Sequence, residues 1–312
     1  MAKLKRDRIK FEAKEDWLAA RCQDLTSTEV SALFGCCPYF TEFELWHNKM
    51  SQTWVEIDDN ERMFWGRELE EPIAKAVAKR EGWNIRKFKT YVRIPSLRLG
   101  ASFDYRILGD PKANFEIKNV DWLQAKQKWI FEKDWVEAPP HIEFQVQHQL
   151  LVSGLKEARI ACLVGGNDVR VVTRYANEKV HDAIKAKAAA FWASVDSGEE
   201  PEPDFERDAS FIMALNQYAE AGKVVETEDQ TIIDMCSQYA KLGKSVGEMS
   251  KARDAIKAQL VTKIGDAEKV LMDGFTISAK MTGETVVQSF TKKAYRNFRI
   301  TAKKKKEQAD GK

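Results

Sequence analysis

The sequence predicts a domain of helices and strands over residues 1–196, followed by a mainly helical C-terminal region over residues 209–300. In the first part, segments with apolar residues every three or four positions alternate with segments in which they recur every second position. The polar, proline-containing stretch "SGEEPEPD" opens a predicted linker over residues 197–208. After it, the apolar spacing is almost entirely helical. We expect residues 301–312 to form a basic, disordered tail.

The composition is that of a soluble globular protein. The chain has 312 residues, 44% hydrophobic and 31% charged, which is enough for one large domain with an appendage. No apolar run is long enough to cross a bilayer, and the N-terminus lacks the apolar segment of a signal peptide. The five cysteines are irregularly spaced, which favours a reducing interior and gives no zinc or iron–sulfur pattern. A net charge of +2 means that any nucleic-acid binding would need a local basic groove.

The N-terminal segments are mostly helical. Residues 16–50 read as two helices joined by a turn, because "LTSTEVSALFG" combines capping residues with an apolar face. A longer helix is expected over residues 62–83, with Leu69, Ile73 and Val77 along one stripe.

The middle of the chain alternates between strands and helices. Strands are expected at residues 90–95, 98–109 and 114–120, with Ser102 and Asp104 on one face of the second. The remaining elements are a helix over 121–132, a helix over 141–154, a β-hairpin of 158–164 and 168–175, and a helix over 178–195.

The C-terminal region has a long apolar repeat. Between Ile232 and Ile264, apolar residues recur at three- and four-residue steps, which predicts a long amphipathic helix or helical hairpin, with a coiled coil as an alternative. Residues 274–281 and 295–300 read as a closing pair of strands.

The segment "NFEIKNV", residues 114–120, raises a functional question. In an extended chain Glu116 and Lys118 share one face, opposite Phe115 and Ile117. This is either the wet face of an edge strand or a chemical site. The turn before the strand would bring Asp104 beside Glu116, and Glu70 can lean inward from its helix. So much converging negative charge is costly unless a hard cation such as Mg²⁺ offsets it.

The pattern Asp…Glu-x-Lys resembles the PD-(D/E)xK nuclease superfamily. Its flanks are "WLAAR", "TSTEVSALFGCCPYFTEFELWHNKM", "WGRELEEPIAKAVAKREGW", "GASFDY", "FEIKNV" and "FQVQHQLLVSG", in this order. As a set they resemble the lambda-exonuclease, or YqaJ-type viral recombinase, family over roughly Trp17 to Trp192. The resemblance implies an α/β fold with a PD-(D/E)xK core, in which a mixed central sheet is flanked by helices.

The resemblance also implies a metal site. The glutamate of W-G-x-x-x-E falls on Glu70, and the metal-binding aspartate falls on Asp104, although a phenylalanine precedes it where many relatives have proline. Glu116 would be the third carboxylate ligand, and the backbone carbonyl of Ile117 a further one. Lys118 would position the attacking water. The expected metal is Mg²⁺, with Mn²⁺ as a substitute.

Five further residues match positions near the site or the DNA in that family. Gln145 and Gln147 lie on the helix close to the metal site, although they could be only a polar helix face. Arg21 and Thr28 match positions that contact the 5′-phosphate, although Thr28 could be only a helix cap. Ser102 matches a polar neighbour of the metal-binding aspartate.

The function implied by the resemblance is degradation of one strand of double-stranded DNA from its 5′ end, leaving a 3′ single strand for recombination by annealing. It also implies a single-strand annealing partner, a homo-oligomer that is often a trimeric ring, no membrane, and the cytoplasm of a bacterial host, with a phage or prophage origin. The alternatives are a structure-specific or nicking endonuclease on the same scaffold and a non-catalytic DNA-binding assembly protein.

Other polar and aromatic residues have simpler interpretations. Glu71 and Lys75 form an i,i+4 pair that we expect on the surface. Neither His141 nor His148 is expected to be catalytic. Core packing is favoured over base stacking for four aromatic residues, Trp122, Trp129, Phe131 and Trp135. The run of lysines at 303–306 is expected to be a solvated tail.

Overall fold

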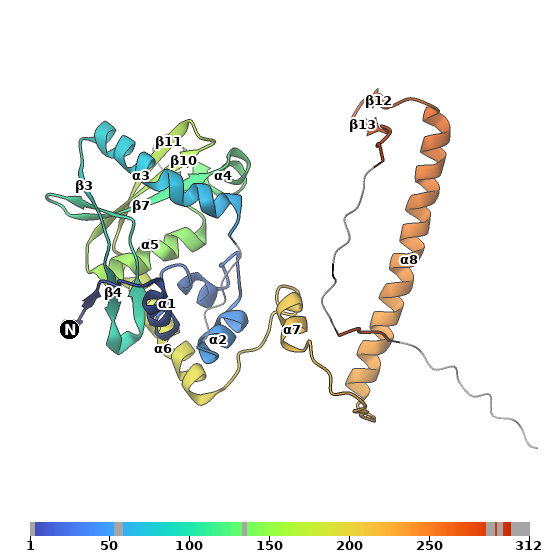
Figure 1. The fold of residues 1–312 in the computed structure, drawn as a ribbon, viewed down its shortest axis with the longest axis horizontal. Coiled ribbons are helices and arrows are strands. Elements are labelled where there is room, and N and C mark those ends of the chain that lie inside the picture. Colours follow the sequence, from blue (N-terminus) through green and yellow to red (C-terminus); the bar gives the residue numbers. More distant parts are fainter. Residues whose placement is uncertain (1–3, 53–58, 133–135, 285–290, 292–295, 301–312) are drawn as a thin grey trace, which may run out of the picture. The chain divides into compact units, whose positions relative to one another are not determined.

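The computed structural model describes residues 4–52, 59–132, 136–284, 291 and 296–300. The chain divides into two compact units, Met1–Met213 and Ala214–Lys312. The first unit contains two mixed sheets and the helices that cover them (Figure 1). The predicted mixed sheet flanked by helices is therefore confirmed, with a second sheet beside it.

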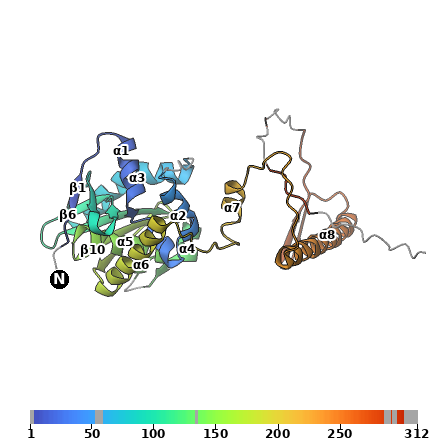
Figure 2. The same cartoon turned by 90° about the horizontal axis from the view of Figure 1, so that it is seen from below.

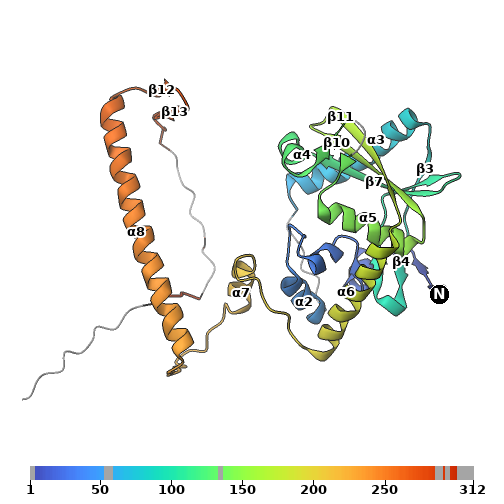
Figure 3. The same ribbon diagram turned by 180° about the vertical axis from the view of Figure 1, so that it is seen from behind.

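The larger sheet has five strands in the order β11-β10-β7-β6-β3. The strand β7 (Ala113–Val120) lies in the middle, parallel to β10 (Glu157–Val164) and antiparallel to β6 (Tyr105–Leu108). The outer strands are β11 (Asp168–Tyr175), which forms the expected hairpin with β10 (Figure 3), and β3 (Asn84–Lys87). Because β7 is internal, the side chains of residues 113–117 are buried on both faces of the sheet.

Helices α3 and α5 cover opposite faces of this sheet (Figure 1). The helix α3 (Glu61–Glu81) contributes Ile73 and Val77 to a core that includes Phe115 and Ile117 of β7. The helix α5 (Pro140–Ser153) packs Val146 and other apolar residues on the β10 side of the opposite face. The even-numbered residues of β7 therefore point toward α5.

The smaller sheet has the order β1-β4-β5-β2. It consists of β1 (Asp7–Ile9), β4 (Tyr91–Ile94), β5 (Leu99–Ala101) and the two-residue β2 (Leu25–Thr26). The predicted single strand over 98–109 is thus wrong. Its first part pairs with β4 in this sheet, and its second part, β6, pairs with β7 in the larger one. The chain passes from one sheet to the other at residues 102–104.

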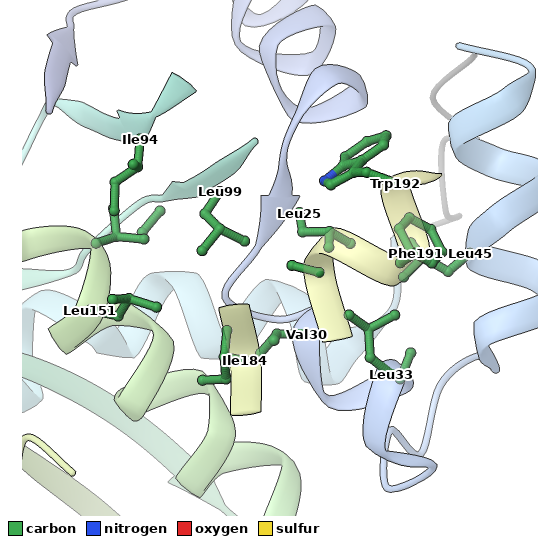
Figure 4. Packing of buried hydrophobic residues seen from close by; sticks show 14 of the residues in the cluster. Leu25, Val30, Leu33, Leu45, Ile94, Leu99, Leu151, Ile184, Phe191 and Trp192 are labelled. Atoms are coloured by element: carbon green, nitrogen blue, oxygen red, sulfur yellow. The ribbon is translucent and has the colours of Figure 1, made fainter. Parts of the chain in front are cut away.

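A large apolar cluster holds the smaller sheet against the helices (Figure 4). Leu25, Ile94 and Leu99 from the strands meet Ile184 and Phe191 of α6 (Glu178–Ser197). The helix α6 packs beside α5 (Figure 2), and α2 (Glu42–Met50) contributes further residues to the same cluster.

The N-terminal helices differ from the prediction. The first is α1 (Lys14–Gln23), but "LTSTEVSALFG" forms β2 and the short 3₁₀ helix η1 (Val30–Phe34) instead of an α-helix. The Glu29 carboxylate accepts a hydrogen bond from the backbone N–H of Thr26 at 2.8 Å, as a capping glutamate would. The capping signal is real, but it starts one short helical turn, which Gly35 ends in the left-handed region.

The predicted helix over 121–132 is shorter in the structure. It comprises α4 (Trp122–Lys128), after which β8 (Ile130–Phe131) pairs with β9 (Val136–Glu137). Trp129 is buried and stacks on Phe131, as expected for core packing. Trp122 is 66% exposed, contrary to that expectation. Trp135 lies outside the described residues.

The stretch predicted as a linker, residues 197–208, belongs to the first unit. Asp208 is 1% exposed and accepts a hydrogen bond from the Thr41 hydroxyl at the start of α2. Three residues further on, Phe211 of α7 (Ala209–Leu215) contacts Phe43 edge-on. The division between units therefore falls later than the sequence suggested.

The second unit contains a long helix and a hairpin. The predicted amphipathic helix is α8 (Gln230–Ile264), and none of its residues is buried. The hairpin pairs β12 (Lys269–Met272) with β13 (Phe275–Ser278), so the expected pairing of residues 274–281 with 295–300 is wrong. Residues 296–300 have no strand, and the tail at 301–312, with its lysines, lies outside the described residues.

The described helices include none with the length and apolar character needed to span a membrane.

Candidate active site

The site is built on β7, where Glu116 and Lys118 point toward α5. Glu116 is 3% exposed, and Phe115 and Ile117 on the other face are buried as well. The interpretation of "NFEIKNV" as a wet edge strand is therefore wrong, because β7 is an inner strand covered on both faces. A buried carboxylate in such a position needs specific partners.

Glu116 has three side-chain partners. Its Oε1 accepts hydrogen bonds from Lys118 Nζ at 2.7 Å and from Gln145 Nε2 at 2.5 Å. Its Oε2 accepts one from Gln149 Nε2 at 2.8 Å. Lys118 Nζ also donates to Gln145 Oε1 at 3.2 Å, so the lysine and the glutamine hold Glu116 together.

Asp104 reaches the same place from the crossing between the two sheets. Its Oδ2 accepts a hydrogen bond from the backbone N–H of Ile117 at 2.8 Å. The β6–β7 register, if continued, would place residue 103 opposite Ile117, but the chain has already left the sheet there. The carboxylate of Asp104 thus replaces the missing backbone acceptor. Since the N–H and C=O of a strand residue point to the same side, the carbonyl of Ile117 faces the same gap.

Glu70 lies one step away from this group. It is a partly exposed residue of α3, and its Oε1 is 3.4 Å from Lys87 Nζ, whose ammonium group lies over the ring of Tyr105. Its negative charge is close enough to contribute to a raised pKa at Asp104. The structure therefore brings Asp104 and Glu116 together directly, whereas Glu70 forms an ion pair with Lys87.

The pKa shifts follow from this crowding. Burial raises the pKa of the Asp104 carboxyl well above its usual range, and the negative charge of Glu116 raises it further, while Lys118 opposes the shift. Burial alone would lower the pKa of Lys118, but the carboxylates of Glu116 and Asp104 outweigh it and leave the pKa raised. The lysine is therefore a cation, and one positive charge faces at least two carboxyl groups.

Gln149 belongs to the site, although we did not predict it from the sequence. It is one helical turn after Gln145, so both amides face Glu116 from α5. The signal was available in the sequence as an i,i+4 pair of glutamines. Gln147 points elsewhere: its Nε2 donates to the carbonyl of Tyr175, and its Oε1 accepts from the N–H of Asn177.

Arg21, expected to bind the 5′-phosphate, and Ser102, expected beside the metal-binding aspartate, form a row next to the carboxylates. Ser102 Oγ accepts a hydrogen bond from Trp17 Nε1 at 3.2 Å, and Arg21 lies over the Trp17 ring at 4.7 Å. Gln149 Nε2 also lies 3.4 Å from the carbonyl of Ser102, which links this row to Glu116. Thr28 is exposed and does not cap η1, whose N-cap is Glu29.

A buried lysine fixes the segment that carries Arg21 and Thr28. Lys49 of α2 donates to the carbonyls of Arg21 and Asp24 at 2.7 and 2.9 Å and to the Glu29 carboxylate at 2.9 Å. Although burial opposes ionisation, the charges of Lys49 and Arg21 lower the pKa of Glu29 below its ordinary value. The segment that carries Arg21 and Thr28 is therefore fixed by the buried hydrogen bonds and ion pair of Lys49.

The donors suit a hard divalent cation by their chemistry. Asp104 and Glu116, with the Ile117 carbonyl, offer the oxygen ligands that Mg²⁺ prefers. The raised pKa of Asp104 is a measure of the repulsion that a cation would relieve. Within the described part of the chain, however, no three acidic, histidine or cysteine side chains are already arranged to hold an ion. Glu70 would have to leave Lys87, and Glu116 would have to exchange part of its hydrogen bonding.

The other expectations for individual side chains can be compared with the structure directly. Glu71 and Lys75 form the predicted exposed i,i+4 ion pair at 2.5 Å. His148 is fully buried and contacts Ser27 Oγ through Nδ1 at 3.2 Å, away from the carboxylates. His141 lies against the exposed ring of Tyr39.

Comparison with known proteins identifies the region that carries this site. Residues 16–156 match the family described as the YqaJ-like viral recombinase domain. The chain is also 28% identical over 267 residues to the uncharacterized protein YqaJ of Bacillus subtilis, covering 82% of this chain and 80% of that protein.

Two solved structures are similar in shape over part of the chain. An alkaline exonuclease from Laribacter hongkongensis aligns with 64% of this chain and all of its own, at 18% identity and a TM-score of 0.49. A phage-related exonuclease from Haemophilus somnus 129PT aligns with 61% of this chain and 89% of its own, at 15% identity and a TM-score of 0.37.

Proposed function

We propose, from the premise that this chain carries a YqaJ-like viral recombinase domain over residues 16–156, that the protein is a Mg²⁺-dependent exodeoxyribonuclease. It degrades one strand of double-stranded DNA from the 5′ end and leaves a 3′ single strand for recombination by annealing. The observation that carries this proposal is that Asp104, from the crossing between the sheets, meets the buried Glu116 and its partner Lys118 on an inner strand within that domain.

Two features of this group favour catalysis over structural support. Asp104 and Glu116 are close enough to raise the pKa of Asp104, an arrangement that costs stability in the absence of a cation. Perturbed, mutually repelling carboxyl groups are typical of functional sites. A purely structural pair would be expected to have its charges balanced within the protein.

Each side chain has a defined role in the proposed reaction. Asp104, Glu116 and the Ile117 carbonyl, joined by Glu70, would hold Mg²⁺ or Mn²⁺. The cation supplies positive charge for the phosphate and a more acidic water. Lys118 donates a hydrogen bond to the attacking water and offsets charge on the scissile phosphate. Gln145 orients the Lys118 ammonium group, which it already contacts at 3.2 Å.

Arg21, Thr28 and Ser102 would receive the 5′-terminal phosphate. Arg21 and Ser102 are linked through Trp17, and Ser102 adjoins Gln149. This row therefore ends beside the carboxylates, where a bound strand end would present its first phosphodiester. Arg21 supplies charge, and Ser102 and Thr28 supply hydroxyl groups.

The proposal extends to the setting of the enzyme. The partners are double-stranded DNA ends and a single-strand annealing protein, and the working form is a homo-oligomer, a trimeric ring, that retains its DNA between cuts. The location is the cytoplasm of a bacterial host, and the gene is of phage or prophage origin.

The proposal is tested by digesting linear duplex labelled at either the 5′ or the 3′ end, with Mg²⁺ and with EDTA. We expect early release of the 5′ label as mononucleotide, retention of the 3′ label, and no reaction in EDTA. Closed circular DNA should resist. Rapid cutting of circular DNA would indicate an endonuclease instead, and full activity in EDTA would overturn the metal-dependent mechanism.

A further inference from the structure

Two arginines face each other on the edge strand β3 and its neighbour β6 in the larger sheet. In the antiparallel pairing of β3 and β6, Arg86 lies directly opposite Arg106. Side chains in such a position share one face of the sheet, and like charges there are destabilising. The protein thus keeps a repulsive pair on the sheet that carries Glu116.

No carboxylate balances the charge of this pair. Within the described part of the chain, neither Arg86 nor Arg106 makes an ion pair with an acidic side chain. The buried Nε of Arg106 has no hydrogen-bond partner there either.

The arginine pair is next to the carboxylate site. Arg106 is opposite Asn114 in the β6–β7 register, and Glu116 is two residues further along β7 on the same face. Arg106 and Glu116 are therefore diagonal neighbours, and such positions are about 7–8 Å apart. Asn114 itself donates to Ser153 Oγ at 3.0 Å at the end of α5, so the face is that of α5.

The helix end nearby does not account for these arginines. The last carbonyls of α5 are already bonded by Arg6, whose Nε donates to the carbonyl of Val152 at 2.9 Å and whose Nη2 donates to that of Leu151 at 3.2 Å. The guanidinium group of Arg106 instead lies over the ring of Phe88, at 4.3 Å from its centre. This contact fixes its orientation but leaves its charge unbalanced.

We propose that Arg86 and Arg106 bind a backbone phosphate of the DNA strand beside the proposed catalytic carboxylates. A phosphate diester matches this pair, because a guanidinium group can donate two parallel hydrogen bonds to its non-bridging oxygens. The bound phosphate would hold the strand along β6, next to Glu116. This inference rests on the proposed function for its choice of DNA as the source of the phosphate.

The first test measures binding of the full-length protein to linear duplex in EDTA over a range of salt concentrations. Arg86→Gln and Arg106→Gln are compared with Arg170→Gln, which removes an exposed arginine paired with Asp168 on the opposite edge of the sheet. We expect each of the first two to weaken binding and to reduce the slope of log affinity against log salt by about 0.9. The control should leave the slope unchanged, and unchanged slopes in all three variants would overturn the inference.

A second test does not require DNA or catalysis. Inorganic phosphate should raise the melting temperature of the wild-type protein more than that of the Arg86→Gln, Arg106→Gln double variant. Without phosphate, the double variant should melt no lower than the wild type, because its like charges have been removed. A lower melting temperature would make the pair structural and overturn the inference.

The two tests separate the possible failures. Reduced salt slopes in a protein that binds DNA but never cuts it would support the arginine site and contradict the nuclease. If the wild type binds no duplex but phosphate stabilises it through Arg86 and Arg106, the site takes free phosphate, and DNA as its source is overturned. If neither ligand depends on these residues, the arginine site is overturned, whatever the cleavage assay shows.

Discussion

At the scale of single residues, Glu116 shows how a carboxylate can be kept in a protein interior. Both of its oxygens are bonded, but among the described residues its one cationic partner is Lys118 at 2.7 Å, which also faces Asp104. The hydrogen bonds satisfy the polar atoms while the charge remains unbalanced. The hydrogen-bonding atoms of Glu116 are therefore satisfied, while the negative charge that a cation would offset remains.

The Lys118→Ala variant tests the role of the ammonium group. We expect nucleotide release to fall by about 10²–10⁴-fold, the range typical of a positioned acid–base group. The melting temperature should change little, because Gln145 and Gln149 still bond Glu116. Affinity for duplex should persist, since most of it comes from other phosphate contacts.

A matched control for this variant is Lys75→Ala, which removes an exposed lysine paired with Glu71. Exposed pairs contribute roughly 0–1 kcal/mol, so its activity and stability should stay near those of the wild type. A Lys118→Ala protein that binds DNA and cuts within a few-fold of the wild type would show that the lysine has no part in the chemistry.

Gln149 and Gln147 allow a contrast within one helix. Gln149→Ala removes an amide that bonds Glu116, so activity should fall at least tenfold with a smaller change in stability. Gln147→Ala removes two hydrogen bonds, one to the carbonyl of Tyr175 and one from the N–H of Asn177, which should together cost about 1–3 kcal/mol of unfolding free energy with little effect on rate. The measurements are denaturant melts and single-turnover cleavage, and the reverse pattern would exchange the two assignments.

His148 makes stability depend on pH. Burial lowers its pKa from 6.5 to about 4 in the folded protein. Between these values the unfolded chain binds more protons, so stability rises with pH. The contribution is present in full above pH 6.5 and is lost as the pH falls toward 4, by roughly 3 kcal/mol in total. His148→Gln should flatten the curve of unfolding free energy against pH between 7 and 5. Curves of equal slope would contradict this assignment.

For single residues, the spacing in the sequence predicted which side chains share a face of a strand or a helix. Period two placed Glu116 and Lys118 on one face, and the structure has them there. The motif "QVQ" placed Gln145 and Gln147 together, but helix residues two apart point in different directions. The partner of Gln145 is Gln149, which geometry rather than the motif identifies. The ion pair of Lys87 with Glu70 joins residues far apart in the sequence, so no local sequence pattern predicts it.

At the scale of elements, β4 and β5 lie so close that one position tolerates no side chain. A Cβ added to Gly100 would overlap the hydroxyl of Tyr91 and lie 2.9 Å from Asp24 Oδ2. That hydroxyl bonds Asp24 Oδ2, which is also tied to Arg93 through the other carboxylate oxygen. Gly100 is therefore required by a buried network and not by a turn.

The Gly100→Ala variant should lose about 1–3 kcal/mol of unfolding free energy, the usual cost of overpacking. Gly66→Ala is the control, since its added Cβ meets no atom within 4 Å on α3. That change should be neutral or stabilise by about 0.5–1 kcal/mol, because alanine favours a helix. Equal melting temperatures for both variants would contradict the packing argument.

Element types were more predictable than their partners. Apolar alternation indicated extended chain over residues 98–109, but it could not show that this stretch is shared between two sheets. The hairpin of β12 and β13 had a local signal that was overlooked. Asp273 and Gly274 form the two-residue turn, and Gly274 has φ 77°, as D-G turns require.

At the scale of the whole molecule, the end of the first unit is fastened to α2. Asp208 accepts from the hydroxyl of Thr41 and from the backbone N–H of Asp204, and Arg207 donates to the carbonyl of Cys37. Composition indicated a linker here, because prolines and acidic residues are typical of linkers. The burial of Asp208 against Thr41 shows instead that this stretch is part of the first unit. Amino-acid composition does not indicate such a contact.

Two truncations test where the first unit ends. A chain ending at Leu215 keeps Asp208 and Phe211 and should melt as one cooperative unit. A chain ending at Asp204 loses both and should melt at a lower temperature, by several degrees for each 1 kcal/mol lost. Asp208→Ala in the longer chain should reproduce part of the loss, and identical melting of the two truncated chains would show that residues 205–215 are dispensable.

Residues 102–104 connect the two sheets covalently, because they run from β5 in the smaller sheet to β6 in the larger one. Strands β5 and β6 belong to different hydrogen-bonded ladders, and residues 102–104 join them along the chain. Asp104 is the last of these residues, and its carboxylate accepts one hydrogen bond from the N–H of Ile117. A displacement of the smaller sheet would therefore be transmitted to the position of Asp104 relative to Glu116. The proposed catalysis would respond to such a strain even where both ladders stay intact.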